Sequence, residues 1–214
     1  MTSCQCQGIE DQFNSREAAK KLADYHKNGP AGTTRLLIAA LKEAGVAGST
    51  LLDIGGGIGA IQLELLKAGA RSAVSVDAST AYIEAAHQEA RRQGLEDNIQ
   101  FQHGDFVELA GGLSSADIVT LDRSLCCYPD MPALIGLSAS RAKSLYALVY
   151  PRDTWWMKLG LGAANWLQQL RGSSFKVFVH PTQAVETILQ QNGLRRHFYR
   201  LAGVWQIAIY ARPS

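Results

Sequence analysis

A glycine-rich motif and a following acid suggest the first chemistry in this chain. The motif is Asp53-Ile54-Gly55-Gly56-Gly57-Ile58-Gly59, with an apolar strand-like pair before it and the helix-like run 61–66 after it. Glycines at a strand-to-helix turn let a ligand approach the backbone, and free N–H groups at a helix start attract a carboxylate or phosphate. Asp77 lies 22 positions after Gly55, the spacing that places a carboxylate near a nucleoside ribose. The pattern predicts an adenosine-containing cofactor.

Four acidic residues help to distinguish S-adenosylmethionine from a nicotinamide dinucleotide as the cofactor. Asp53, Asp77, Asp105 and Asp122 close four predicted parallel strands, whose carboxyl ends form the ligand crevice of an open α/β sheet. A rim of carboxylates repels a pyrophosphate but attracts a sulfonium with an ammonium group. This favours S-adenosylmethionine. Because Gly55-x-Gly57-x-x-Ala60 also satisfies the dinucleotide fingerprint, an NAD(P)-dependent oxidoreductase stays an alternative.

Alternating apolar runs predict the elements that carry these residues. Strands are expected near 50–54, 72–77, 98–104, 117–121 and 144–149, with helices near 58–68, 79–93 and 130–140. A helix over 181–191 precedes strands 195–201 and 205–211, whose short connection allows only antiparallel pairing. We therefore expect an α/β fold with a Rossmann-like, doubly wound sheet, mostly parallel with a reversed C-terminal strand.

The segments outside this alternation are expected to cover it. A polar helix is predicted from Gly8 to Lys27, and a second one capped by Thr33 or Thr34. The organisation is then a single domain over 1–214, with a helical cap at 1–47 and a core at 48–214 that carries an insertion at about 152–176. The insertion holds three tryptophans (Trp155, Trp156 and Trp166) and is interpreted as a lid over an apolar substrate. A helix packed on the sheet or a dimer contact are the alternatives, and a membrane-surface helix is the least favoured.

With these motifs, the chain from about Thr50 to Arg212 resembles class I S-adenosylmethionine-dependent methyltransferases. The resemblance implies that the glycine turn holds the methionine end of the cofactor. It implies that Asp77, with Ala78 beside it, binds the ribose, and that Asp105 and Phe106 bind and cover the adenine. Residues 122–130 and 203–210 are distantly similar to magnesium-protoporphyrin O-methyltransferases, which usually carry a histidine before the tyrosine that Tyr128 matches. Here that position is Cys127.

Methyl transfer from a sulfonium is a one-step displacement, so the protein must align the nucleophile, exclude water and remove a proton where needed. His26, Tyr25, Asp122 and Tyr128 are the candidates for this catalytic role, and Asp122 is also a candidate cofactor contact. The expected function is methylation of a small, apolar or aromatic molecule. Besides the oxidoreductase, a non-catalytic S-adenosylmethionine-binding protein stays an alternative.

The charge composition of the chain bears on which kinds of molecule it could bind. Lys and Arg total 21 against 19 Asp and Glu, and a net charge of +2 gives no reason to expect nucleic acid. The N-terminal residues lack the pattern of a signal peptide and no run reaches the ~18 apolar residues of a membrane span, so we expect a cytoplasmic protein without stable membrane insertion. The four cysteines, Cys4, Cys6, Cys126 and Cys127, have spacings that suit reduced thiols and no metal site. A monomer and a homodimer both stay open.

Overall fold

One seven-stranded sheet forms the centre of the molecule. The computed structural model describes residues 4–170 and 172–213, with side chains from Gly8 onward. The strands are β1 (Thr50–Ile54), β2 (Ser72–Asp77), β3 (Ile99–His103), β4 (Ala116–Asp122), β5 (Ala142–Pro151), β6 (Arg195–Ala202) and β7 (Trp205–Ala211). Their order in the sheet is β3-β2-β1-β4-β5-β7-β6. The first five strands are parallel, whereas β7 runs antiparallel to both β5 and β6. The predicted fold class is confirmed.

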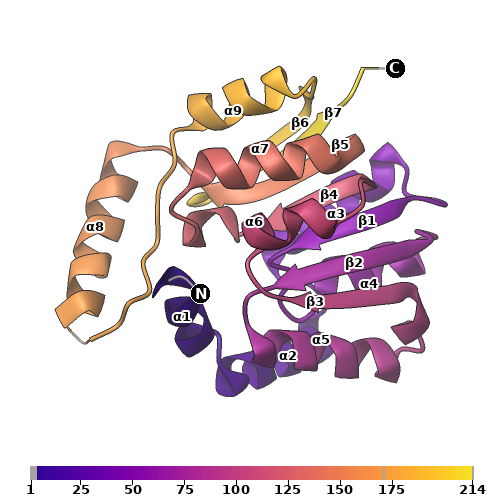
Figure 1. Cartoon of the computed structure of the whole chain (residues 1–214), viewed down its shortest axis with the longest axis horizontal. Helices are drawn as coiled ribbons and strands as arrows, with labels where there is room; N and C mark the ends of the chain where they lie inside the picture. The colour runs from indigo at the N-terminus through magenta and orange to yellow at the C-terminus, as the bar shows by residue number, and fades with distance from the viewer. Residues whose placement is uncertain (1–3, 171, 214) are drawn as a thin grey trace.

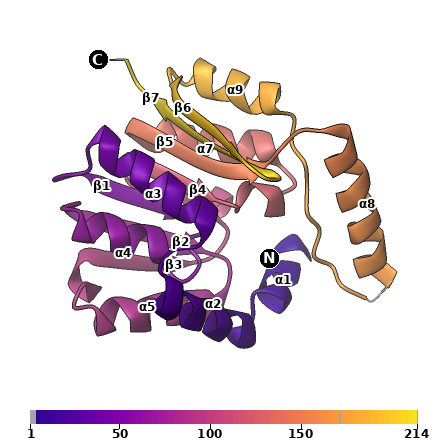
Figure 2. The same cartoon turned by 180° about the vertical axis from the view of Figure 1, so that it is seen from behind.

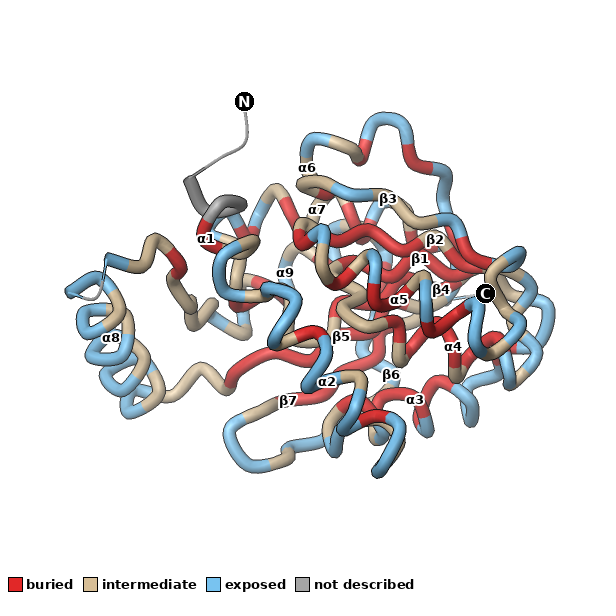
Figure 3. The backbone as a smooth tube through the Cα atoms, turned by 90° about the horizontal axis from the view of Figure 1, so that it is seen from below, coloured by how far each residue is buried: buried red, intermediate tan, exposed pale blue. Residues whose placement is uncertain are grey.

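Helices cover both faces of the sheet because successive side chains of each strand point to opposite faces. On β1, Leu52 belongs to one apolar cluster and Leu51 to the other. Figures 1 and 2 show the two covering layers: α6, α7 and α9 lie on one face, and α3, α4 and α5 on the other. These helices are α3 (Gly32–Ala44), α4 (Ala60–Lys67), α5 (Thr80–Arg92), α6 (Phe106–Leu109), α7 (Met131–Arg141) and α9 (Thr182–Gln191). The central strands are therefore buried on both sides (Figure 3).

The N-terminal region differs from the single helix predicted between Gly8 and Lys27. Two helices are present, α1 (Cys4–Gln12) and α2 (Ser15–Asn28), and the chain turns between them. Asn14 causes the break: its side-chain oxygen accepts hydrogen bonds from two backbone N–H groups in the first turn of α2. This is an N-cap interaction, which a continuous helix would not permit.

The start of α3 also differs from the prediction. The helix begins at Gly32 after Ala31, whose side chain makes no capping bond. Thr34, predicted as a possible cap, lies inside the first turn and donates its hydroxyl to Asp122 instead. Its polar group therefore joins the N-terminal region to the end of β4.

The insertion contains a single helix, α8 (Trp155–Leu170), that stands apart from the sheet (Figures 1 and 3). No residue of α8 is buried. Trp155 is 77% exposed, Trp166 64% and Trp156 42%. The described part of the chain after α8 returns alongside it to α9 (Figure 1).

Candidate active site

A cavity of about 890 Å³ lies at the carboxyl ends of the parallel strands. All four acids of the predicted rim line it, namely Asp53, Asp77, Asp105 and Asp122. The N-terminal helices and the turn between them supply much of the other wall, including Ile9, Phe13 and Tyr25. The sheet thus brings together residues that are almost 70 positions apart in the sequence, as expected for the crevice of an α/β fold.

The glycine turn closes one side of this cavity. Gly55 and Gly57 line the cavity with left-handed backbone angles, φ 69° and 55°. A Cβ atom on Gly55 would lie 2.5 Å from the Cβ of Ser124, a distance that no side chain could occupy. Gly59, the third predicted cofactor-binding glycine, is instead the N-cap residue of α4 with φ 85° and is not among the residues that line the cavity.

Asp77 ties the glycine turn to the start of α5. Its Oδ2 accepts a hydrogen bond of 2.9 Å from the Gly57 backbone N–H, and its Oδ1 accepts one of 2.9 Å from Ser79. Burial raises the pKa of this carboxyl, although both backbone bonds oppose the rise. Each oxygen can accept a further bond. Ala78, next to Asp77, also lines the cavity.

Asp105 and Phe106 lie at the start of α6. Asp105 Oδ1 accepts from the Val107 backbone N–H at 2.9 Å and so caps this short helix. The Tyr128 hydroxyl donates to the same carboxylate, 3.0 Å from Oδ2. Phe106 is buried and lines the cavity. Tyr128 is therefore attached to the predicted adenine site through Asp105, a contact that the sequence did not indicate.

Asp53 is fully buried beneath the glycine turn. Its Oδ1 accepts a 2.6 Å hydrogen bond from the Thr120 hydroxyl, whereas its Oδ2 has no hydrogen-bond partner within the described part of the chain. Ser75 and Gln62 lie around the same glycine turn, and their side-chain polar atoms also lack partners there. Burial raises the pKa of Asp53 from 3.8 to about 7. The Asp53 Oδ2 therefore lies with other buried polar atoms beneath the glycine turn.

Asp122 joins the end of β4 to the N-terminal helices. Its Oδ2 accepts from the Thr34 hydroxyl at 2.5 Å, and the Arg123 Nε donates to its Oδ1 at 3.2 Å. Arg123 has φ 59°, the only positive value for a non-glycine residue among those described. Such backbone strain is concentrated at functional sites. All three residues line the cavity.

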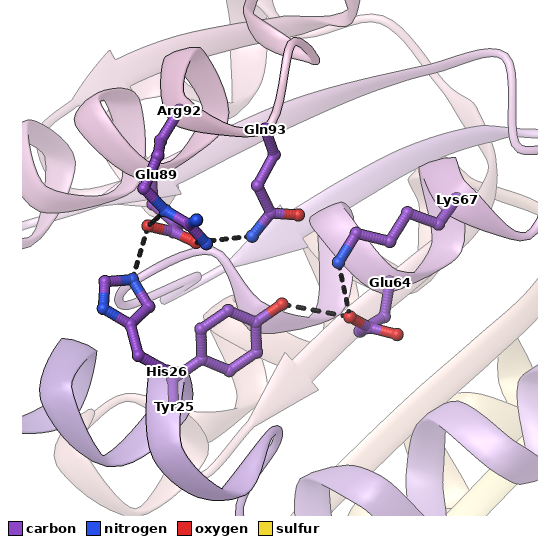
Figure 4. A network of polar contacts seen from close by, with 7 residues as sticks. All are labelled: Tyr25, His26, Glu64, Lys67, Glu89, Arg92 and Gln93. Carbon is purple, nitrogen blue, oxygen red and sulfur yellow. Dashed lines mark hydrogen bonds and ion pairs between the residues drawn. The ribbon is translucent and has the colours of Figure 1, made fainter.

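The two catalytic candidates on α2 are engaged elsewhere. Tyr25 reaches the cavity wall, but its hydroxyl donates to Glu64 Oε1 at 3.0 Å, and burial raises its pKa. The His26 Nε2 lies 2.7 Å from Glu89 Oε2, and His26 does not line the cavity. Figure 4 shows both side chains directed into a polar network with helices α4 and α5.

Glu89 is the centre of this network. Arg92 binds its two oxygens at 2.6 and 2.9 Å, and His26 and Gln93 contact them as well. The bonds from Arg92, followed by those from His26 and Gln93, lower the pKa of Glu89 to about 2, against the opposing effect of burial. The network attaches α2 to α5, so His26 has a structural role here.

The insertion contributes to the cavity in a way that the sequence did not predict. Leu161 of α8 and the following Phe175 and Val177 line the cavity, whereas the three exposed tryptophans do not. The hypothesis of a tryptophan lid is therefore wrong in this structure. The hypothesis of a helix packed on the sheet is also wrong, because no α8 residue is buried.

The sulfur atoms of Cys126 and Cys127 lie 4.0 Å apart at the cavity wall, too far for a disulfide bond. Cys4 and Cys6 have side chains outside the described residues. No group of three or more His, Cys, Asp or Glu side chains in the described portion could hold a metal ion.

Within residues 4–170 and 172–213, no helix has the length and apolar character needed to cross a membrane.

A family model described as a methyltransferase domain matches residues 46–173 of this chain, which is more than half of its length. The chain belongs to this methyltransferase family. The match covers the glycine turn and all four acids of the rim.

Solved structures support the same fold for this methyltransferase. It is similar to magnesium protoporphyrin IX methyltransferase from Synechocystis PCC 6803 with bound SAH, at a TM-score of 0.75 and 20% identity, over 98% of this chain and 100% of that one. It is also similar to a putative sarcosine dimethylglycine methyltransferase from Galdieria sulphuraria, at a TM-score of 0.66 and 15% identity, over 84% and 85% of the two chains.

Among curated proteins, ribosomal protein L11 methyltransferases match part of the chain. The protein from Deinococcus radiodurans is 36% identical over 76 residues, which are 36% of this chain and 28% of that protein. The protein from Alteromonas mediterranea is 35% identical over 89 residues, 41% and 30% of the two chains. The aligned segment thus spans less than a third of these relatives. The family match shows a methyltransferase domain, and its fold is shared with structures of magnesium protoporphyrin IX methyltransferase that hold SAH or SAM.

Proposed function

We propose that this methyltransferase acts on a small apolar or aromatic molecule by direct in-line methyl transfer. The observation that carries the proposal is the cavity itself, which continues from the carboxylate rim to an apolar wall. Its volume of about 890 Å³ is near the upper end of the roughly 300 to 1,000 Å³ of small-molecule sites. The apolar wall contains Ile9, Phe13, Leu134, Leu161, Phe175 and Val177. A cofactor and an acceptor could share this space.

The residues at the strand ends fit S-adenosylmethionine. Gly55 and Gly57 expose backbone on the cavity side, and we assign them, with Asp53 beneath them, to the methionine end. We assign Asp77 and Ala78 to the ribose, and Asp105 and Phe106 to the adenine. When bound, S-adenosylmethionine supplies a methyl group on a positively charged sulfur. Gly59 acts indirectly, by starting α4.

Asp122 is our proposed acceptor for the proton that leaves the nucleophile. Thr34 and Arg123 fix its carboxylate at the cavity wall, and a fixed carboxylate within reach of the nucleophile can act as a general base. Tyr128 positions Asp105 through its hydroxyl. Tyr25 and His26 are not retained as bases, because Glu64 and Glu89 engage their polar atoms.

A protein acceptor is the second candidate, and the ribosomal protein L11 methyltransferases are the observation that favours it. The aligned segment is 76 to 89 residues long in the two relatives, so it supports a shared domain more directly than a shared acceptor. In this chain the N-terminal helices and the turn between them line part of the cavity wall. This wall favours an acceptor small enough to be enclosed.

The test is to incubate the enzyme with methyl-labelled S-adenosylmethionine and a cell extract, and then to separate small molecules from protein. Label in the small-molecule fraction supports the proposal, whereas label confined to protein contradicts it. Asp122→Asn should reduce turnover by about 10² to 10⁴-fold while S-adenosylhomocysteine still binds. Asp97→Asn, at an exposed position away from the cavity, is the matched control and should leave both properties unchanged.

A further inference from the structure

The outer face of α8 is an apolar surface with no cover in the described structure. At 100° per residue, six large side chains form one stripe about 120° wide along the helix. They are between 42% and 77% exposed: Trp155, Trp156, Leu159, Trp166, Leu167 and Leu170. Contiguous apolar surface of this kind marks an interaction site, whereas single exposed apolar residues need no explanation.

Packing on the opposite side fixes which face of α8 points outward. Met157, Leu161 and Asn165 are partly buried toward the body of the molecule. The Asn165 side chain forms two hydrogen bonds with the backbone of Val177, donating to its carbonyl at 2.7 Å and accepting from its N–H at 2.9 Å. Rotating the helix to hide the tryptophans would break both bonds. A surface helix usually turns its large apolar side chains toward the core, whereas most of those on α8 face outward.

A second copy of the chain is the alternative cover for the stripe, and the oligomeric state in solution tests it. A helix of 16 residues is ~24 Å long, and a lipid interface accepts a single shallow helix of this kind.

The charges around α8 match an anionic surface. Residues 152–185 contain four basic residues, Arg152, Lys158, Arg171 and Lys176, and one acid, Asp153, which forms an ion pair with Lys158 at 2.6 Å. The segment keeps a net positive charge. Tryptophan is favoured at the boundary between headgroups and acyl chains, and basic residues are attracted to anionic lipids. A helix of 16 residues is shorter than the ~20 that span a bilayer, so it would lie in the plane of the surface.

We propose that the outer face of α8 docks this enzyme on a lipid bilayer that contains anionic lipid. The stripe enters the interface, and the Asn165 side stays on the protein. Leu161, on the protein side of the same helix, lines the active-site cavity. Docking would therefore place the cavity within about one helix diameter, ~10 Å, of the lipid. This inference concerns an interaction surface and does not depend on the proposed acceptor.

The test measures co-sedimentation of the full chain with vesicles of phosphatidylcholine alone and of phosphatidylcholine mixed equally with phosphatidylglycerol. We expect binding to the mixed vesicles, with a blue shift of tryptophan fluorescence, and much weaker binding to the neutral ones. Leu159→Glu and Trp166→Glu should each reduce the partition coefficient roughly tenfold or more. Leu201→Glu, at a 46% exposed apolar position on β6, is the matched control and should bind normally.

S-adenosylhomocysteine binding reports whether each variant is folded, since the cofactor residues lie on other elements. Absence of binding to the mixed vesicles would overturn the proposal, and so would equal binding to neutral vesicles or equal binding by the Glu variants. Sedimentation velocity supplies the remaining check. A dimer that Trp166→Glu dissociates, with no vesicle binding, would show that a second copy covers the stripe.

Discussion

Asp53→Asn replaces a buried carboxyl with a neutral amide of nearly the same shape. Burial raises the pKa of Asp53 to about 7, with smaller contributions from the charges of Asp122 and Asp77. At 1.36 kcal/mol per pH unit, the rise from 3.8 to about 7 corresponds to about 4 kcal/mol against folding at alkaline pH. The amide can still accept from Thr120 and could donate to the unpartnered oxygens nearby. We expect the ligand-free variant to gain about 1 to 4 kcal/mol of unfolding free energy near pH 8.

The sign of the pH dependence follows from where the proton is held. Between about pH 4 and pH 7, the folded protein keeps the Asp53 proton that the unfolded chain has released. The wild-type unfolding free energy therefore falls as pH rises through this window, and the full loss is present above about pH 7. Below about pH 4 both states hold the proton, so the wild type and Asp53→Asn should become equal in stability.

Urea unfolding of the ligand-free proteins across this pH range measures the effect. Asp117→Asn is the control of opposite sign, because the backbone and side-chain bonds from Thr50 lower the pKa of Asp117. That variant should lose stability at neutral pH, and the loss should disappear on acidification through the lowered pKa. If Asp53→Asn shows no gain near pH 8, or a gain that persists unchanged near pH 4, then the carboxyl is not held neutral by its surroundings. Cofactor affinity should fall in the same variant.

Three further outcomes are expected. Asp77→Ala should weaken S-adenosylhomocysteine binding by about 1 to 3 kcal/mol in titration calorimetry, and a wild-type affinity for NAD above that for S-adenosylhomocysteine would contradict the assignment of the cavity. Gly55→Ala should lower the thermal midpoint more than Gly48→Ala. Both glycines have positive φ, which costs an alanine about 1 to 2 kcal/mol, but only the alanine at position 55 would also clash with a neighbouring side chain. His26→Ala should change turnover less than tenfold and reduce thermal stability. A loss of turnover of about 10²-fold or more would instead indicate that His26 is a general base.

The sheet could be predicted from the sequence because each strand of a buried parallel sheet is a short apolar run with a polar stop. Every observed strand lies within two residues of its predicted bounds, and the acids at the ends of β1, β2 and β4 marked the cavity. The antiparallel β7 followed from the length of the connection before it. Local sequence and tertiary structure agree in these elements, so the prediction needed no knowledge of packing.

The sequence misleads where tertiary packing or a single capping residue determines the local structure. Asn14 breaks the N-terminal helix through two hydrogen bonds, although the surrounding residues favour helix. His26 suited a base by type, but its orientation depends on Glu89, 63 positions away. The tryptophans of α8 suggested a buried lid because large apolar side chains are usually covered. Asn165 fixes the rotation of the helix, and no local pattern shows that it would bind Val177.

The position of β7 has a consequence for folding during synthesis. β7 follows every other strand in the chain, yet it lies between β5 and β6 and carries fully buried residues such as Ile207 and Ile209. Until the ribosome has released this segment, β5 is an unpaired edge rich in Leu, Val and Tyr, which is a template for aggregation. The nascent chain therefore stays vulnerable until its last strand emerges, and chaperone demand should be greatest at that stage.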